Sequence, residues 1–350
     1  MMGQEHIRNI ALVPGARVTC VYDPVPELAR AASELAGDAA ISSSLADLLA
    51  DDNLDALVVV SPNHLHVAQL AQIAETRPLP LLMEKPLYTD PGDRAGVERI
   101  TADYPAPIWV AMEYRYMPPI AALIAEAESA TGGVRMLSLR EHRFPFLPKI
   151  GNWNRFNANS GGTFVEKCCH FFDLMRLIVK SEPVRIMATG GQAVNHLSET
   201  YDGRTPDIWD HGYVVADFAN GARAMLELCM FAEGSRFQEE ICALGPEGKI
   251  VARVPGPGRF WPETAGPSPV PELEISPRHP KAPILREIPV DPALLTAGDH
   301  NGSTFYQHQR FNAVVRGEGQ VEVGVEDGIR AVAMGLAAQQ SAMTGQAVDL

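Results

Sequence analysis

Lys85 stands at a position where a lysine side chain can take part in chemistry. It follows the apolar run Leu81-Leu82-Met83 and Glu84, and Pro86 comes next. If this run is a buried parallel strand, Lys85 lies at its carboxyl end, the edge at which open α/β sheets bind ligands. Pro86 biases Lys85 toward an extended backbone, and a cis bond to the proline would fix its direction. On position alone, a solvated lysine is the more common interpretation.

A second group of ionisable residues, Glu166, His170 and Asp173, lies in the apolar segment 161–175. In a helix they would occupy positions i, i+4 and i+7 and form one polar stripe, which needs partners or a wet cleft. A structural role, with His170 held by a hydrogen bond in the core, stays open. Zinc is less favoured, because the third ligand would be another carboxylate and no HExxH pattern exists, so we expect no metal.

The N-terminus carries part of a dinucleotide-binding pattern. Gly3 can supply the third glycine of GxGxxG, whose role is close helix packing. Residues 18–22 form a good second strand, and Asp23 closes it about 20 residues after Gly3, the interval that the motif requires. An acidic side chain there binds a ribose diol and repels a 2′-phosphate, so NAD is preferred over NADP. The alternative is that Asp23 and Pro24 only form a turn.

The first two glycines of the motif, and the strand that carries them, are missing from the sequence. In this topology the first strand is central, so its omission would leave two strand edges unpaired. We expect that the sequence begins at an internal methionine and that a longer form of the protein carries the missing strand.

The first third of the chain alternates apolar runs with amphipathic stretches, as in a doubly wound parallel sheet covered by helices. Strands are predicted at 18–22, 56–60, 79–83 and 108–112, and helices at about 26–36, 44–50 and 66–74. The fold class is therefore α/β, with a Rossmann-type domain over residues 1–117.

A second domain is predicted over residues 118–350, because the strand-like segments become longer and alternate. They lie at 134–140, 184–190, 212–218 and 222–230. Such runs indicate a large, mostly antiparallel sheet that is open on one face, and hence an α+β domain. Segment 255–283 is rich in proline, which favours an ordered extended loop or flap.

The composition excludes several classes of function. The 350 residues carry a net charge of −14 without a basic stripe, so a nucleic-acid partner is not expected. No apolar run approaches the ~18 residues that span a bilayer, and no signal peptide is evident, so we expect a cytoplasmic protein. The five cysteines lack CxxC spacing and indicate neither a disulfide framework nor a zinc site.

Three segments together resemble the glucose–fructose oxidoreductase, inositol dehydrogenase and rhizopine catabolism (Gfo/Idh/MocA) family. They are Glu84-Lys85-Pro86, the stretch Ser61-Pro62-Asn63-His64-Leu65-His66, and the segment from Gly161-Gly162 through His170-Phe171-Phe172-Asp173. The resemblance runs from Gly3 to the last helix. It implies a Rossmann domain, a second domain with a large open sheet, bound NAD(P), and dimers or tetramers formed through that sheet.

The resemblance also assigns roles to single residues. Lys85 is similar to the family's catalytic lysine and His170 to its catalytic histidine. Glu166 stands where inositol dehydrogenases have aspartate, and its longer side chain puts inositol itself in doubt. Ser61, Pro62, Asn63 and His66, with Glu84, are similar to the loops on the nicotinamide side, and Arg115 to the segment that enters the substrate domain. Further candidates for substrate contact are Trp153, Arg155, Asn157, Asp173 and His300.

These residues predict the oxidation of a sugar or cyclic polyol, with hydride leaving to nicotinamide. His170 is the natural base near neutral pH, and Lys85 as an ammonium can stabilise charge on the oxygen, although the two could exchange roles. Reduction of a keto sugar, an NAD-dependent glycosidase and a noncatalytic sugar- or nucleotide-sensing regulator remain alternatives, because fold alone does not determine function.

Overall fold

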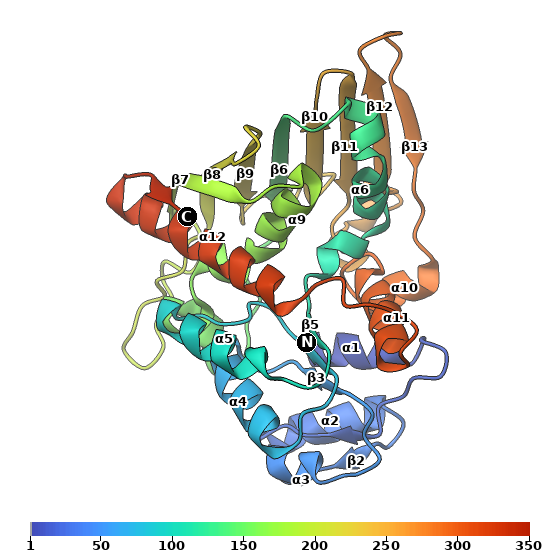
Figure 1. Ribbon diagram of the computed structural model, residues 1–350, viewed down its shortest axis with the longest axis vertical. Helices are drawn as coiled ribbons and strands as arrows, with labels where there is room; N and C mark the ends of the chain where they lie inside the picture. Colours follow the sequence, from blue (N-terminus) through green and yellow to red (C-terminus); the bar gives the residue numbers. More distant parts are fainter. Residues whose placement is uncertain (1) are drawn as a thin grey trace.

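The computed structural model describes residues 2–350, and its N-terminal third alternates short strands with helices (Figure 1). The strands are β1 (Cys20–Val21), β2 (Ala40–Ile41), β3 (Leu57–Val59), β4 (Leu81–Met83) and β5 (Ile108–Val110). The helices are α1 (Met2–Ile10), α2 (Pro26–Leu35), α3 (Leu45–Leu49), α4 (His66–Thr76) and α5 (Arg94–Ala102). The elements predicted in this region are confirmed, although the strands are shorter than expected.

The parallel strands of this region form two separate sheets. β1 pairs with β2, and β3, β4 and β5 pair in that order. Within residues 2–350, no strand lies between β1 and β3. The expectation that a longer form carries a further strand stays a prediction.

The rest of the chain forms a nine-stranded sheet within residues 2–350, in the order β13-β12-β11-β10-β6-β9-β8-β7-β14. All neighbours are antiparallel except β6 and β9, which confirms the predicted mostly antiparallel sheet. The strands are β6 (Met136–His142), β7 (Pro183–Gly191), β8 (His211–Phe218), β9 (Arg223–Cys229), β10 (Glu239–Leu244), β11 (Gly248–Val254), β12 (Glu272–Pro277), β13 (Ile284–Glu287) and β14 (Val348–Asp349).

Helices cover one face of this sheet, namely α6 (Pro118–Thr131), α9 (Cys169–Val179) and α12 (Val325–Thr344) (Figure 1). Side chains alternate along the central strands, so Val214, Ala216 and Leu226 are buried beneath the helices. On the other face Tyr213, Val215 and Met225 are exposed. The sheet is therefore open on one side. The remaining helices are α7 (Asn157–Ser160), α8 (Thr163–Glu166), α10 (Pro292–Ala297) and α11 (Ser303–Val315).

The prediction that residues 255–283 form a loop is wrong for β12. Residues 272–277 pair with β11 on one side and β13 on the other. The physical reason is the apolar pair Leu273 and Ile275, which alternates with Glu272 and Glu274 and suits a strand with one buried face. The part before β12 is irregular apart from two short 3₁₀ turns.

The C-terminal elements return to the Rossmann-type region. The amide of Val110 in β5 donates a hydrogen bond to the carbonyl of Val323, at 3.0 Å. Arg115 lies in a short 3₁₀ helix, η3 (Glu113–Tyr116), and its Nε donates to Asp173 of α9 at 2.6 Å. A second Arg115 nitrogen donates to the Glu322 carbonyl at 2.9 Å. The Val110 amide and the Arg115 side chain thus connect β5 and η3 to the C-terminal part of the chain. The domain division at residue 118 stays a prediction.

No helix within residues 2–350 is both long and apolar enough to cross a lipid bilayer.

Candidate active site

A continuous cleft of about 2090 Å³ runs between the Rossmann-type elements and the large sheet. Small-molecule sites typically occupy ~300–1,000 Å³, so this cleft has room for a dinucleotide and a further ligand. Eleven residues predicted from the sequence as site residues line it. They are Gly3, Asp23, Ser61, Pro62, Asn63, Glu84, Lys85, Trp153, Glu166, His170 and His300.

Lys85 enters the cleft from the carboxyl end of β4, whose three residues are fully buried. Its peptide bond to Pro86 is cis, as the sequence suggested. The Nζ of Lys85 donates a hydrogen bond to the carbonyl of Glu166 at 2.9 Å. Burial opposes the charge, yet anionic neighbours, including Glu84 and Glu166, raise the pKa of Lys85 above its usual value. Lys85 is therefore an ammonium at neutral pH.

His170 lies in the first turn of α9 with its ring flat against Tyr114. The two ring centres are 4.1 Å apart and the planes differ by 7°. Burial, followed by the charges of Lys85 and Lys167, lowers the pKa of His170 well below its usual value. His170 is thus a neutral imidazole at neutral pH, and its Nδ1 has no hydrogen-bond partner among the residues that the structure describes.

Glu166 is the last residue of α8 and contacts two lysines, Lys85 through its backbone carbonyl and Lys149 through its carboxylate. Its Oε1 accepts from Lys149 Nζ at 3.2 Å, and its Oε2 is buried without a partner within residues 2–350. The predicted polar stripe on one helix is wrong, because α8 ends at Glu166 and α9 begins at Cys169. Lys167, between the two helices, is buried, and Asp173 pairs with Arg115.

Lys167 anchors a buried network on the far side of His170. Its Nζ lies 2.5 Å from Tyr114 Oη and 2.8 Å from Glu141 Oε1. Burial, followed by the charge of Glu141, raises the pKa of the neighbouring Glu239 to about 7. Because Tyr114 is held by Lys167, the ring that stacks on His170 is fixed in place.

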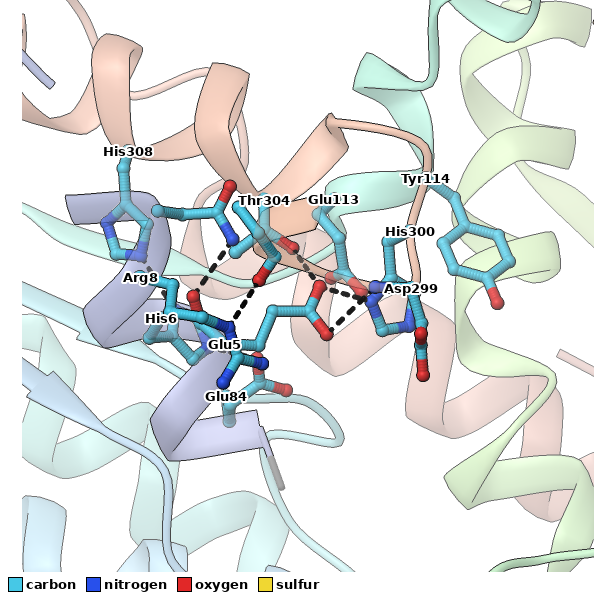
Figure 2. Close-up of polar contacts among 12 residues, drawn as sticks. Glu5, His6, Arg8, Glu84, Glu113, Tyr114, Asp299, His300, Thr304 and His308 are labelled. Carbon is cyan, nitrogen blue, oxygen red and sulfur yellow. Dashed lines mark hydrogen bonds and ion pairs between the residues drawn. The ribbon is translucent and has the colours of Figure 1, made fainter. Parts of the chain in front are cut away.

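Glu84 connects three elements behind Lys85. Its Oε1 is 2.8 Å from His6 Nε2 on α1, and His6 Nδ1 is 2.7 Å from His308 Nε2 on α11 (Figure 2). Glu84 Oε2 accepts from the amide of Lys85 at 3.1 Å. Burial opposes ionisation, but His6 lowers the pKa of Glu84 below its usual value. The carboxylate thus holds the backbone that carries Lys85.

A second pair, Glu5 of α1 and His300, lies beside Glu113 and Tyr114 (Figure 2). Glu5 Oε1 is 2.7 Å from His300 Nδ1, and it accepts from Thr304 Oγ1 at 3.0 Å. Burial disfavours the charged form of both side chains, but the charge of each stabilises the charge of the other. The pKa of Glu5 is lowered to about 2 and the pKa of His300 is raised to about 9. His300 is therefore an imidazolium at neutral pH.

The cofactor side of the cleft fits a dinucleotide. Gly3 is in the first turn of α1, and a Cβ there would meet nothing within 4 Å, which leaves room for a phosphate at the helix N-terminus. Asp23 follows β1, and its Oδ1 accepts from the amide of Val25 at 2.9 Å. Ser61 and Asn63 follow β3 at the same edge.

Five predicted residues lie outside the cleft, and the structure gives them structural contacts. Arg115 and Asp173 bind each other, so the predicted substrate contact is corrected for both. Arg155 donates to Glu199 at 2.9 Å, and Asn157 binds Asp207 through its amide and side chain. His66 is fully buried and bonds the carbonyls of Pro86 and Ser61, so it supports both loops without touching the cleft.

Sequence reasoning missed several ionisable residues that line the cleft. Glu5 and His6 lie two and three residues after Gly3, Glu113 and Tyr114 lie just before Arg115, and Lys167 follows Glu166, so closeness in sequence was an available signal. Arg143 and Glu239 had no such signal, because strand register alone brings them to the site. These seven residues line the cleft with the predicted ones.

The Glu5–His300 pair makes stability depend on pH in a defined direction. The raised pKa of His300 stabilises the fold below about pH 6.5, and this contribution is lost as pH rises through about 9. We expect Glu5→Gln to lower the free energy of unfolding more at about pH 6 than at about pH 10. Urea unfolding at both pH values measures this difference. Glu126→Gln removes an exposed pair with Arg286 and should show the same small change at both. If Glu5→Gln lowers the free energy of unfolding equally at both pH values, the raised pKa of His300 is contradicted.

Comparison with known proteins agrees with this arrangement. The chain is 24% identical to the uncharacterized oxidoreductase YrbE of Bacillus subtilis over 226 residues, 65% of this chain and 63% of that protein. It is 27% identical to an inositol 2-dehydrogenase of Acidothermus cellulolyticus over 271 residues, 74% of each chain. A solved levoglucosan dehydrogenase complex with NADH and levoglucosan has the same fold, with a TM-score of 0.82, 21% identity, and coverage of 100% of this chain and 96% of that one.

Two family models match the chain. Residues 1–111 match the NAD-binding Rossmann fold of the oxidoreductase family, and residues 129–350 match its C-terminal alpha/beta domain. Because these matches cover more than half of the sequence, the chain belongs to the Gfo/Idh/MocA oxidoreductase family.

Proposed function

We propose that the protein is an NAD-dependent dehydrogenase of a sugar or cyclic polyol. The observation that carries this proposal is the pairing of a neutral imidazole, His170, with an ammonium, Lys85, in a cleft that has room for a dinucleotide as well. Support comes from relatives that are named inositol 2-dehydrogenases and from a levoglucosan dehydrogenase with the same fold.

The two residues divide the work on the substrate alcohol. Lys85 donates to the hydroxyl oxygen and stabilises the negative charge that develops there. His170 is neutral, and one of its ring nitrogens has no hydrogen-bond partner within residues 2–350. It removes the hydroxyl proton as a general base. Bound NAD supplies the hydride acceptor. Gly3 and Asp23 would hold it at the phosphate and ribose, and Ser61 and Asn63 on the nicotinamide side.

The rest of the cleft suits a ligand rich in hydroxyl groups. Glu166 Oε2 and Glu239 Oε2 are buried and have no hydrogen-bond partner in the described part of the chain, so both can accept from hydroxyls. Lys149 lies over the Trp153 ring at 4.3 Å, at the mouth of the cleft beside Glu166. Because glutamate reaches farther than aspartate, we propose a polyol other than inositol as the preferred substrate.

NADH formation tests the proposal directly. The full-length protein is given NAD with a panel of inositols, aldoses and anhydrosugars, and absorbance is followed. We expect activity with one class, and Lys85→Ala should lower kcat about 100- to 10,000-fold because an essential charge is lost. Lys180→Ala, at an exposed pair with Glu128, is the matched control and should keep full activity. Reduction of neither NAD nor NADP by any member of the panel would refute the proposal.

NAD is preferred over NADP because of Asp23. Its carboxylate can accept from the adenosine ribose diol, and its charge repels a 2′-phosphate. Asp23→Ser should raise KM for NAD about tenfold, the effect of losing a charged hydrogen bond, and should narrow the preference over NADP. Asp52→Ser, at an exposed position outside the cleft, should leave KM for NAD and the preference for NAD over NADP unchanged. An unaltered ratio of kcat/KM for NAD and NADP in Asp23→Ser would count against this role.

We also propose a homo-oligomer formed through the open face of the large sheet. Met187, Val215 and Met225 are cross-strand neighbours there and are 55%, 43% and 39% exposed. A contiguous exposed apolar patch of this kind marks an interface, and a two-fold axis would bury two copies of it together.

A charge at the centre of this patch tests the interface. Light scattering after size exclusion should give a dimer or tetramer for the wild type and a smaller species for Val215→Asp, because the charge would be buried unpaired. Leu35→Asp, at a 39% exposed position on α2, should leave the mass unchanged. A wild-type monomer, or a Val215→Asp protein of unchanged mass, would exclude this interface.

A further inference from the structure

Glu113 begins η3, and its carboxylate lies next to His170. Glu113 Oε1 is 3.8 Å from His170 Nε2, and both side chains are only 2% exposed. Glu113 Oε2 and His170 Nδ1 are buried and lack a hydrogen-bond partner within residues 2–350. Both residues line the cleft. Each of these two groups therefore has hydrogen-bonding capacity that the described residues do not use.

Charged groups from three elements face Glu113. Glu84 and Lys85 follow β4, His300 precedes α11, and His170 lies on α9. Figure 2 shows Glu113 next to His300, whose other side is held by Glu5. Burial and the charge of Glu84 outweigh His300 and Lys85, and they raise the pKa of Glu113 to about 7. Glu113 can thus gain and lose a proton near neutral pH.

A proton cannot remain on His170. The ring is buried, and it faces four other cationic groups, which are Lys85, Lys167, His300 and Arg143. A buried imidazolium among these charges is strongly disfavoured. Lys85 cannot take the proton, because its raised pKa keeps it an ammonium.

Two further carboxylates of this buried region each have a lysine partner at one oxygen. Glu166 is paired with Lys149 at 3.2 Å, and Glu141 with Lys167 at 2.8 Å. Glu113 has no such lysine partner within residues 2–350 and is the carboxylate that faces His170 Nε2.

We propose that Glu113 accepts the proton that His170 removes from the substrate alcohol, so that the two residues form a proton relay. This relay rests on the proposed function. The hydroxyl O–H bond breaks and its proton goes to the neutral His170 ring, while the proton on Nε2, the nitrogen that faces Glu113, passes to Glu113. Hydride leaves the same carbon for the bound cofactor, and a carbonyl forms. His170 ends neutral, and Glu113 ends as a carboxylic acid that releases its proton to solvent.

The contact of 3.8 Å has to shorten for the transfer. Such contacts are commonly long without substrate and tighten in the reactive complex. The geometry also defines the role of Glu113, which acts through His170 and is a positioning and proton-accepting residue.

The pH dependence of kcat tests the relay. Glu113 must be ionised to accept a proton, so wild-type kcat should fall as pH decreases through about 7. Glu113→Gln should lose this acid limb and lower kcat about 10- to 100-fold, while KM changes little. Glu113→Asp should restore part of kcat together with the limb, which a merely structural role would not do. Glu128→Gln, at an exposed glutamate outside the cleft, is the matched control.

Infrared spectroscopy supplies a readout that needs no turnover. A buried carboxylic acid band that titrates near pH 7 should be lost in Glu113→Gln. Glu239→Gln should remove a separate band, because its pKa is also about 7, and this assigns the two.

The outcomes separate the relay from the proposed function. A wild type that reduces no NAD would refute the function. If the wild type is active, the relay alone is refuted when Glu113→Gln keeps the acid limb. It is also refuted when Glu113→Gln raises KM and leaves kcat intact, because Glu113 would then bind a substrate hydroxyl.

Discussion

The buried charge of Glu84 is the constraint on which the arrangement of the site depends. An ionised carboxylate removed from water costs several kcal/mol unless it is paired, so its partners cannot move independently. Glu84 is held by His6 of α1, which is backed by His308 of α11, and it binds the amide of Lys85. One carboxylate thus joins α1, the strand that carries Lys85, and α11.

The same electrostatic logic sets the protonation states in the cleft. Lys85 keeps its proton because carboxylates surround it, and His170 loses its proton because cations surround it. Two groups whose surroundings drive their pKa values apart are typical of an acid and a base that act together. Lys167 extends this control, since it holds both Glu141 and the tyrosine that stacks on His170.

Much of the fold and the centre of the site could be predicted from the sequence. Apolar runs, turn residues and the Glu84-Lys85-Pro86 triplet are local signals. The structure has strands and helices where the first two predict them, and the triplet lies at the end of β4. Residues 166–173 were predicted to form one helical stripe, because periodicity cannot show that the helix is interrupted between Glu166 and Cys169. Arg115 was predicted to contact substrate, but its partner Asp173 is 58 residues away in sequence. Long-range pairing and strand register, which place Glu239, leave no mark on a single sequence.

Isotope transfer from the substrate carbon shows whether hydride passes directly to the cofactor. A polyol that supports NAD reduction is deuterated at the carbon to be oxidised, and the mass of the NADH formed is determined. We expect NADH that carries one deuterium, because the hydrogen on that carbon would pass to the cofactor without exchanging with water. NADH without deuterium, or substrate consumed with no net NADH, would contradict simple oxidation and indicate a different reaction in the same cleft.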